Sequence, residues 1–181
     1  MNEKKESLTV IEVLQHSRHD WMNHIQLIKG FLSLGKIQEA ERAIEQTVMQ
    51  ARQEAHVCSL PFPELAEMLV TFNWKKHLFR LDCEVVDRNI HIEAEEACLV
   101  QWLSFIFDAL ENGVEPYAEN HLYLAIEEAE KGIRFFFEFS GIITEIEALN
   151  SQLEEALGAS HVQRWKVHSY SAKEMQFEAI I

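Results

Sequence analysis

Residues 16–30 read His16-Ser17-Arg18-His19-Asp20-Trp21-Met22-Asn23-His24-Ile25-Gln26-Leu27-Ile28-Lys29-Gly30 and lie within a longer helical pattern. A row of mostly apolar residues runs through this stretch at alternating steps of three and four: Ile11, Leu14, Arg18, Trp21, Ile25, Ile28 and Leu32. Such a heptad row is typical of a helix that packs along a seam against partner helices. Arg18 is its one polar member. The stretch therefore predicts a long amphipathic helix whose seam faces other helices.

His19 lies just off this seam. It is about 100° round the helix from Arg18, so its ring is expected to reach water. Asp20 is its neighbour, and Asn23 follows one helical turn later on nearly the same face. A solvated imidazole beside a carboxylate and a guanidinium suits a nucleophile or a proton carrier, whereas His16 and His24 have no adjacent acid. The alternative is that His19 is a surface histidine without chemistry.

The helical pattern extends over residues 8–34, with Ser7 or Thr9 as its cap, and Gly35 provides a stop. Residues 36–57 form a second helical pattern, and so short a connection requires an antiparallel αα-hairpin. Two helices bury too little of seams this long. We therefore expect two hairpins to associate as a four-helix bundle, which makes the protein a homodimer. The alternative is that the hairpin folds onto the C-terminal part of its own chain.

The pattern changes at Pro61-Phe62-Pro63, which we interpret as the boundary between a helical domain, 1–60, and a second domain, 61–181. Helices are expected in this second domain at 64–78, 94–110 and 142–157, and strands at 80–86, 121–127, 133–139, 162–167 and 175–181. Strands grouped under helices predict an α/β sandwich, and the whole chain is α+β.

Composition excludes several classes of protein. The formal net charge is −14, which disfavours nucleic-acid binding because the phosphate backbone would be repelled. Cys58, Cys83 and Cys98 are odd in number and contain no CxxC pair, which indicates reduced thiols. The polar start of the chain lacks a signal-peptide pattern, and no apolar run is long enough to span a bilayer. We therefore expect a soluble, cytoplasmic protein with no membrane partner.

Two blocks of sequence resemble the sporulation initiation phosphotransferase B family of spore-forming bacilli. They are residues 16–30 and residues 69–75, the latter with Thr71-Phe72-Asn73-Trp74-Lys75. The match thins after the second block, although the order of elements agrees to the C-terminus. In looser form, Arg18-His19-Asp20 followed by Asn23 also resembles the phosphoacceptor box of sensor histidine kinases.

The resemblance implies a dimeric bundle of helical hairpins with an attached domain similar to the ATPase domain of histidine kinases. It also implies a function in sporulation initiation. A phosphoryl group would pass from the aspartyl phosphate of one response regulator to a second regulator, through a phosphohistidine at His19. An imidazole is a good nucleophile near neutral pH because much of it is unprotonated. Asp20 is expected to orient the ring and Arg18 to hold phosphate, with Asn23 beside them. The alternatives are that Arg18 pairs inside the bundle and that Asp20 is merely solvated.

No cluster of residues has metal-ligand spacing, so Mg²⁺ is expected to come from the docked regulator. Residues 108–115, Asp108 to Glu115, look like a degenerate form of the sequence box that supplies an asparagine to Mg-ATP in histidine kinases. A nucleotide site also needs glycine-rich loops whose backbone approaches the phosphates. Gly141 is instead followed by Ile142-Ile143-Thr144, and no further glycine occurs before Gly158. We therefore expect no ATP binding. The alternative functions are an autokinase and a non-catalytic dimeric scaffold that sequesters a regulator.

Overall fold

The computed structural model describes residues 8–87, 90, 94–130 and 132–181. The chain divides into two compact units, one up to Arg52 and one from Gln53 to Ile181.

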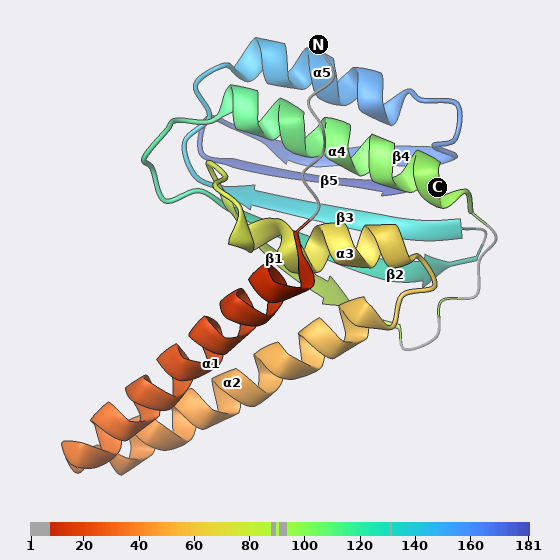
Figure 1. The fold of residues 1–181 in the computed structure, drawn as a ribbon. Helices are drawn as coiled ribbons and strands as arrows, with labels where there is room; N and C mark the ends of the chain where they lie inside the picture. The colour runs from red at the N-terminus through yellow and green to blue at the C-terminus, as the bar shows by residue number, and fades with distance from the viewer. Residues whose placement is uncertain (1–7, 88–89, 91–93, 131) are drawn as a thin grey trace. The chain divides into compact units, whose positions relative to one another are not determined.

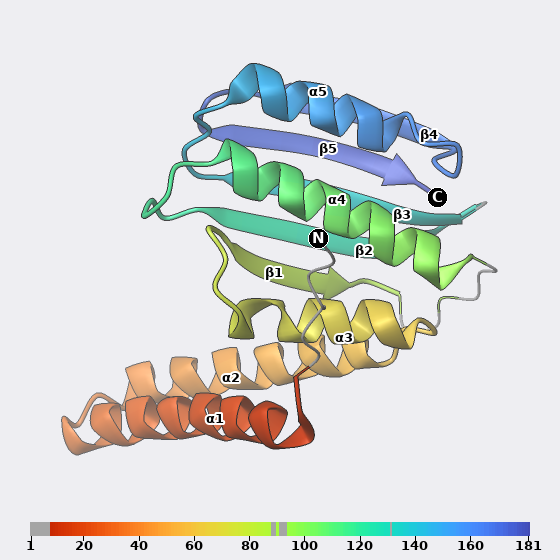
Figure 2. The same cartoon turned by 45° about the horizontal axis from the view of Figure 1, so that its top comes forward.

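The first unit is an antiparallel helical hairpin. It consists of α1 (Val10–Ser33) and most of α2 (Ile37–Cys58), which lie side by side in Figures 1 and 2. Thr9 caps α1, because its hydroxyl accepts from the Glu12 N–H while the Glu12 carboxylate accepts from the Thr9 N–H. Gly35 follows α1 with a φ of 70°, a left-handed conformation that glycine adopts without strain. The expected tight hairpin is confirmed.

The seam of the hairpin is uncovered within a single chain. Ala40 and Ala43 of α2 are buried, whereas α1 has no buried residue. Five apolar members of the heptad row are 49–64% exposed: Ile11, Leu14, Trp21, Ile25 and Leu32. Ile28 is half-buried. The hairpin therefore presents an apolar face, interrupted by Arg18, to its surroundings.

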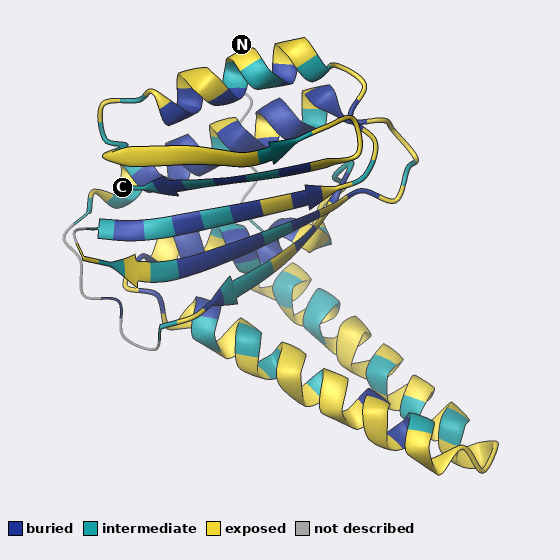
Figure 3. Cartoon of the chain, turned by 180° about the vertical axis from the view of Figure 1, so that it is seen from behind, coloured by how far each residue is buried: buried dark blue, intermediate teal, exposed yellow. Residues whose placement is uncertain are grey.

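The second unit is a five-stranded mixed sheet with helices over one face. Its elements are α3 (Pro63–Thr71), the 3-10 helix η1 (Phe72–Trp74), β1 (Arg80–Val85), α4 (Glu96–Gly113), β2 (His121–Ala129), β3 (Gly132–Ser140), α5 (Ile146–Leu157), β4 (Arg164–Tyr170) and β5 (Glu174–Ile180). The strand order is β1-β2-β3-β5-β4, in which only β1 and β2 run parallel. Figure 3 shows the sheet from the side that carries no helix. The predicted α+β class is confirmed.

Alternation along the strands creates the core between sheet and helices. Phe135, Phe137 and Phe139 of β3 are fully buried, and Phe137 stacks on Phe177 of β5 with ring centroids 4.4 Å apart. The Trp102 indole packs against the same layer and donates to the Ala156 carbonyl at 3.0 Å. Burying each such aromatic side chain stabilises the fold by about 1.5–3 kcal/mol.

Several element boundaries differ from the sequence prediction, and three of them occur at helix ends that have a clear structural neighbour. The helix expected at 64–78 ends at Thr71, because Asn73 leaves the helix to exchange two hydrogen bonds with the Leu81 backbone, at 2.7 and 3.0 Å. The helix expected to end at residue 110 continues through Gly113. The helix expected from residue 142 begins only at Ile146, because Ile143 forms an antiparallel bridge to Val114.

The compact units divide eight residues before the boundary expected at residues 60 and 61. The reason is that Val57 and Leu60 are buried in the core of the second unit. The end of α2 and the segment before Pro61 thus belong structurally to the α/β unit.

Candidate functional site

The first candidate site is centred on His19, in the middle of α1. Its side chain is 72% exposed, in agreement with the phase of the heptad row. Nδ1 of the ring lies 3.2 Å from Oδ1 of Asp20 and 3.3 Å from Nδ2 of Asn23. The helix therefore brings both neighbours to the same ring nitrogen and leaves Nε2 without either of these contacts.

These contacts define how the ring can act. A carboxylate only accepts hydrogen bonds, so the contact with Asp20 requires a proton on Nδ1. In that tautomer Nε2 carries the lone pair and could act as a nucleophile. The Asn23 amide nitrogen only donates, so it binds Nδ1 when that atom has no proton. Asp20 and Asn23 therefore serve two different protonation states of the same ring.

The other two histidines of the stretch are less available. His24 faces α2, where its Nδ1 lies 3.4 Å from the Thr47 hydroxyl and its ring meets Trp21 edge-on. His16 is half-buried. His19 is thus the histidine of this stretch that combines exposure with an adjacent carboxylate.

Arg18 is exposed and forms no ion pair with any residue that the structure describes. The structure therefore does not bring it to Asp20 or to His19. Its guanidinium is available to an incoming anion or to a partner helix.

A second region of interest lies where α4 ends. Val114 and Ile143 form a β-bridge, and two backbone bonds extend it: Glu115 N–H to the Ile142 carbonyl and Thr144 N–H to the Gly113 carbonyl, both at 2.8 Å. The Ile143 side chain is buried. The segment after β3 is thereby joined along its backbone to the end of α4.

Asn120, which the sequence pattern did not single out, is 3% exposed and forms hydrogen bonds to three loops. Its amide nitrogen donates to the carbonyls of Leu78 and Glu115, both at 2.9 Å, and its amide oxygen accepts from the Ile142 N–H at 3.0 Å. A Cβ atom at Gly141 would lie 2.3 Å from that oxygen, so this position requires glycine. The only sequence signal was a single asparagine just before a strand.

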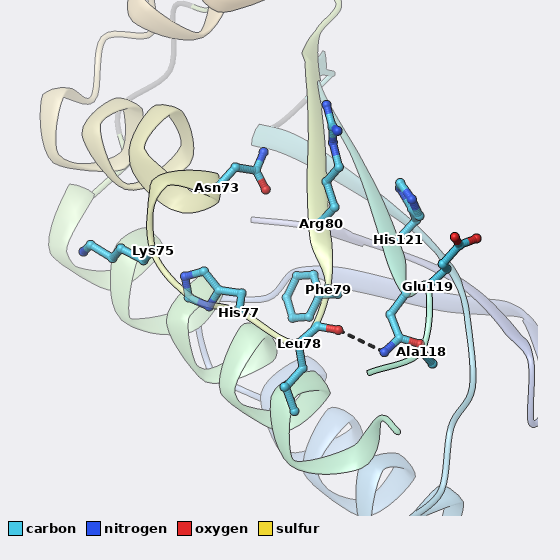
Figure 4. A pocket seen from close by; sticks show the side chains of 10 residues that line it. Asn73, Lys75, His77, Leu78, Phe79, Arg80, Ala118, Glu119 and His121 are labelled. Carbon is cyan, nitrogen blue, oxygen red and sulfur yellow. Dashed lines mark hydrogen bonds between the residues drawn. The ribbon is translucent and has the colours of Figure 1, made fainter. Parts of the chain in front are cut away.

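Asn120 also borders a pocket of about 570 Å³, shown in Figure 4, at the start of β1 and β2. Arg80 and His121 line it, and both lie near Asp82, at 3.6 and 3.8 Å. His77 also lines it and contacts the Glu111 carboxylate at 2.7 Å. Arg80, His77 and His121 of this pocket therefore each lie beside one of the protein's own carboxylates.

Among the described residues, no group of three or more His, Cys, Asp and Glu side chains is arranged to hold a metal ion. The helices within the described part of the chain are all too short or too polar to cross a membrane.

Comparison with known families identifies both parts of the chain. Residues 1–60 match the α-helical domain of the sensor kinase SpoOB type, and residues 61–180 match the C-terminal domain of sporulation initiation phosphotransferase B. The chain belongs to the sporulation initiation phosphotransferase B family. The family predicted from residues 16–30 and 69–75 is thereby confirmed.

A family member from Bacillus subtilis (strain 168), sporulation initiation phosphotransferase B, is 31% identical over 163 residues. The match covers 89% of this chain and 85% of the relative. Among solved structures, the histidine kinase AdeS of Acinetobacter baumannii is similar with a TM-score of 0.47 and 11% identity, covering 90% of this chain and 96% of that one. A bacterial phosphotransferase is similar with a TM-score of 0.42 and 13% identity, covering 96% and 98%.

Proposed function

We propose that this chain accepts a phosphoryl group from the aspartyl phosphate of one response regulator on His19 and passes it to a second regulator. Membership of the family makes the chain a phosphotransferase of a sporulation phosphorelay. The observation that carries the assignment to His19 is the exposed ring whose Nδ1 contacts Asp20 and whose Nε2 makes neither of the contacts of Nδ1.

The proposed step is an in-line displacement at phosphorus. The Nε2 lone pair forms the N–P bond while the P–O bond to the regulator's aspartate breaks and that carboxylate leaves with the electron pair. The ring keeps its Nδ1 proton and becomes positively charged, and the Asp20 carboxylate stabilises this charge. The reverse attack by the second regulator's aspartate releases neutral imidazole, so the same geometry serves both transfers.

Arg18 and Asn23 have supporting roles in this proposal. The Arg18 guanidinium, which forms no ion pair with a described residue, is available to neutralise phosphoryl oxygens during transfer. Asn23 holds the phosphorylated ring when Nδ1 has lost its proton. Mg²⁺, bound by the carboxylates of the docked regulator, would supply further neutralisation of the phosphoryl oxygens.

The proposal includes a homodimer. The exposed apolar members of the heptad row on α1 require a cover, and a second hairpin of the same sequence offers a matching face. His19 points off this row, so it stays accessible in a four-helix bundle.

ATP has no role in the proposed reaction. The segment that a glycine-rich loop would occupy is bridged to the end of α4, and its Ile143 side chain is buried in the core. The α/β unit would instead support or dock the regulator. A cytoplasmic location, which suits the free cysteines Cys58, Cys83 and Cys98, is part of the same proposal.

The deciding experiment mixes the protein with a ³²P-labelled phospho-regulator and maps the product. Acid-labile, base-stable label on the peptide that contains His19 is the expected result. Label that appears from Mg-ATP alone would establish an autokinase instead. A stable complex without covalent label would establish a sequestering scaffold.

A further inference from the structure

The edge strand β4 differs in charge from the rest of the molecule. Residues 156–173, which include all of β4, contain no aspartate or glutamate, although the chain holds 30 of them in 181 residues. The same segment carries Arg164, Lys166 and Lys173, together with His161 and His168. A locally basic strand therefore forms one border of a protein whose net charge is −14.

Apolar and basic side chains alternate along this strand. Trp165 and Val167 lie opposite Ala179 and Phe177 of β5, on the helix-bearing side of the sheet, yet they remain 43% and 41% exposed. Arg164 and Lys166 occupy the alternate positions and point to the other side. The strand thus presents an apolar row on one side and a basic row on the other.

The basic row is not neutralised by the protein itself. Within the described part of the chain, Arg164 and Lys166 form no ion pair. The carboxylate nearest to them in register is Glu178, opposite Lys166. Glu178 is already occupied by Arg134 and by His168, whose Nε2 lies 3.3 Å away.

The backbone of β4 is also open on its outer side. β4 is hydrogen-bonded to β5 and to no other strand of the sheet formed by the described residues, as Figures 1 and 3 show. Every second residue of β4 directs its N–H and C=O groups to this outer side, and these groups therefore lack a strand partner. A second copy of the chain is a poor partner here, because edge-to-edge pairing would place Arg164 and Lys166 against the same basic residues.

We propose that β4 binds an extended acidic segment of a partner protein by strand addition, with carboxylates on the basic row and apolar side chains against Trp165 and Val167. Backbone hydrogen bonds to the open edge supply affinity, and the two rows of side chains supply selectivity. The irregular register between Val167 and Ser169 limits the pairing to the first part of β4. This inference is independent of phosphotransfer, because it concerns a different unit of the chain from His19.

The test uses the full-length protein and a short fluorescein-labelled peptide in which glutamate and valine alternate. Fluorescence anisotropy should show saturable binding that weakens with added salt. A peptide in which lysine replaces each glutamate should not bind. On binding, hydrogen exchange of the backbone amides at residues 164–167 should slow, which electrostatic attraction alone would not produce.

Two charge-reversal variants distinguish peptide binding at β4 from attraction by the overall charge of the protein. In R164E/K166E we expect binding about tenfold weaker or worse, because two attractions become repulsions. In K75E/K76E, which changes the net charge equally at two exposed residues elsewhere, binding should change less than about twofold. The single variant K166E provides a milder test if the double variant unfolds.

The proposal is overturned by any of four outcomes. Equal binding of the lysine peptide would remove the charge argument. Equal weakening by K75E/K76E would place binding elsewhere. Undisturbed binding of a peptide whose central residues are prolines, which cannot donate backbone hydrogen bonds, would exclude strand addition. The absence of any binding would leave Lys166 as a device that prevents edge-to-edge aggregation.

Discussion

Two side chains share one nitrogen of His19, and this sharing determines its chemistry. The Asp20 carboxylate accepts a hydrogen bond from Nδ1 when this nitrogen carries a proton, and the Asn23 amide donates one to Nδ1 when it does not. One of the two side chains can therefore hold the ring in either protonation state. Because the side chain is largely exposed, its removal leaves no cavity.

His19→Ala should therefore abolish phosphoryl acceptance while the fold remains intact. Transfer of label from a phospho-regulator measures phosphoryl acceptance, and thermal unfolding shows whether the fold is intact. His24→Ala is the matched control, because it removes a histidine of the same helix and should retain acceptance. Full labelling of the His19 variant would redirect the assignment to His16 or His24.

Asp20→Asn should slow acceptance by roughly tenfold to a hundredfold, because the amide does not stabilise the charged ring as the carboxylate does. Regulator binding should be unchanged within about twofold, since no contact to a partner is proposed for Asp20. Single-turnover transfer rates and binding affinity, measured separately, check both expectations. An equal loss of affinity and rate would instead assign Asp20 to docking.

Cys83 provides a probe of the second unit. Burial, followed by the nearby Glu84, raises the pKa of its thiol to about 12, so at about pH 8 only about one molecule in ten thousand carries the thiolate. We expect Cys83 to resist iodoacetamide in the native protein and to react once the protein is unfolded. The exposed Cys58 should react in both states, and peptide mass spectrometry distinguishes the two.

At the scale of an element, α1 combines two functions on one helix. One side of α1 carries the apolar row and another carries His19. The capping box at Thr9 and the glycine at Gly35 fix the two ends of the helix. In the proposed function, the phase between the two sides sets where the phosphoacceptor His19 lies relative to the dimer seam.

Ile25→Asp or Ile28→Asp should give monomers or an unfolded hairpin, because an unpaired charge in a packed seam is costly, by about 3 kcal/mol or more. Sedimentation analysis of the variants measures the change. Gln26→Asp adds the same charge to the same helix off the seam and should remain dimeric. An unchanged dimer in both isoleucine variants would show that α1 does not form the interface.

On the sheet, Arg134 of β3 is held by Glu127 of β2 and Glu178 of β5. Arg134, and then His168, lowers the pKa of Glu178 below its ordinary value of 4.5. A depressed folded-state pKa gives stability that is complete above the unfolded-state pKa and is lost as pH falls through the folded value.

Glu178→Gln should therefore lower the unfolding free energy by about 0.5–1.5 kcal/mol at neutral pH. It should also reduce the loss of stability on acidification below about pH 4.5. Glu174→Gln, on the same strand and the same face, is the control. Urea unfolding across this pH range checks both, and parallel curves for wild type and Glu178→Gln would refute the coupling.

The sequence predicts these elements unevenly, for physical reasons. The hairpin follows from a heptad row and one glycine, both local signals, and the strands around Phe135 follow from alternation. The end of α3 was not predictable in the same way, because Asn73 leaves the helix to bind Leu81, a partner supplied by another element. The late start of α5 likewise depends on the Val114–Ile143 bridge. Asp20 and Asn23 were found because helical spacing alone brings them to His19, whereas Asn120 acts only through loops that folding assembles.

At the scale of the whole molecule, charge and loop structure are the two grounds on which we expect no nucleotide binding. A triphosphate carries several negative charges, and a protein of net charge −14 binds it only with a dedicated set of backbone donors and cations. At the end of α4, the backbone groups of Gly113 and Glu115 are engaged by the segment 142–144.

We expect titration calorimetry with Mg-ATP to show no saturable heat at micromolar concentrations of the protein. The physical reason is that opening the segment would break the backbone bonds of Glu115 and Thr144 and expose Ile143. Saturable binding in the micromolar range would contradict this expectation and favour the autokinase.

The close approach between Gly141 and Asn120 also constrains the evolutionary history of the chain. A side chain at 141 would clash with the Asn120 amide oxygen, and a change at 120 would remove the hydrogen bonds that Asn120 makes to the Leu78 carbonyl, the Glu115 carbonyl and the Ile142 N–H. A Cβ atom at 141 would also lie 2.9 Å from the Phe139 ring and 3.0 Å from the Asn120 Cα, so a change of the Asn120 side chain alone would not make room for it. Each position is constrained on its own, and we expect descendants of this sequence to keep both residues.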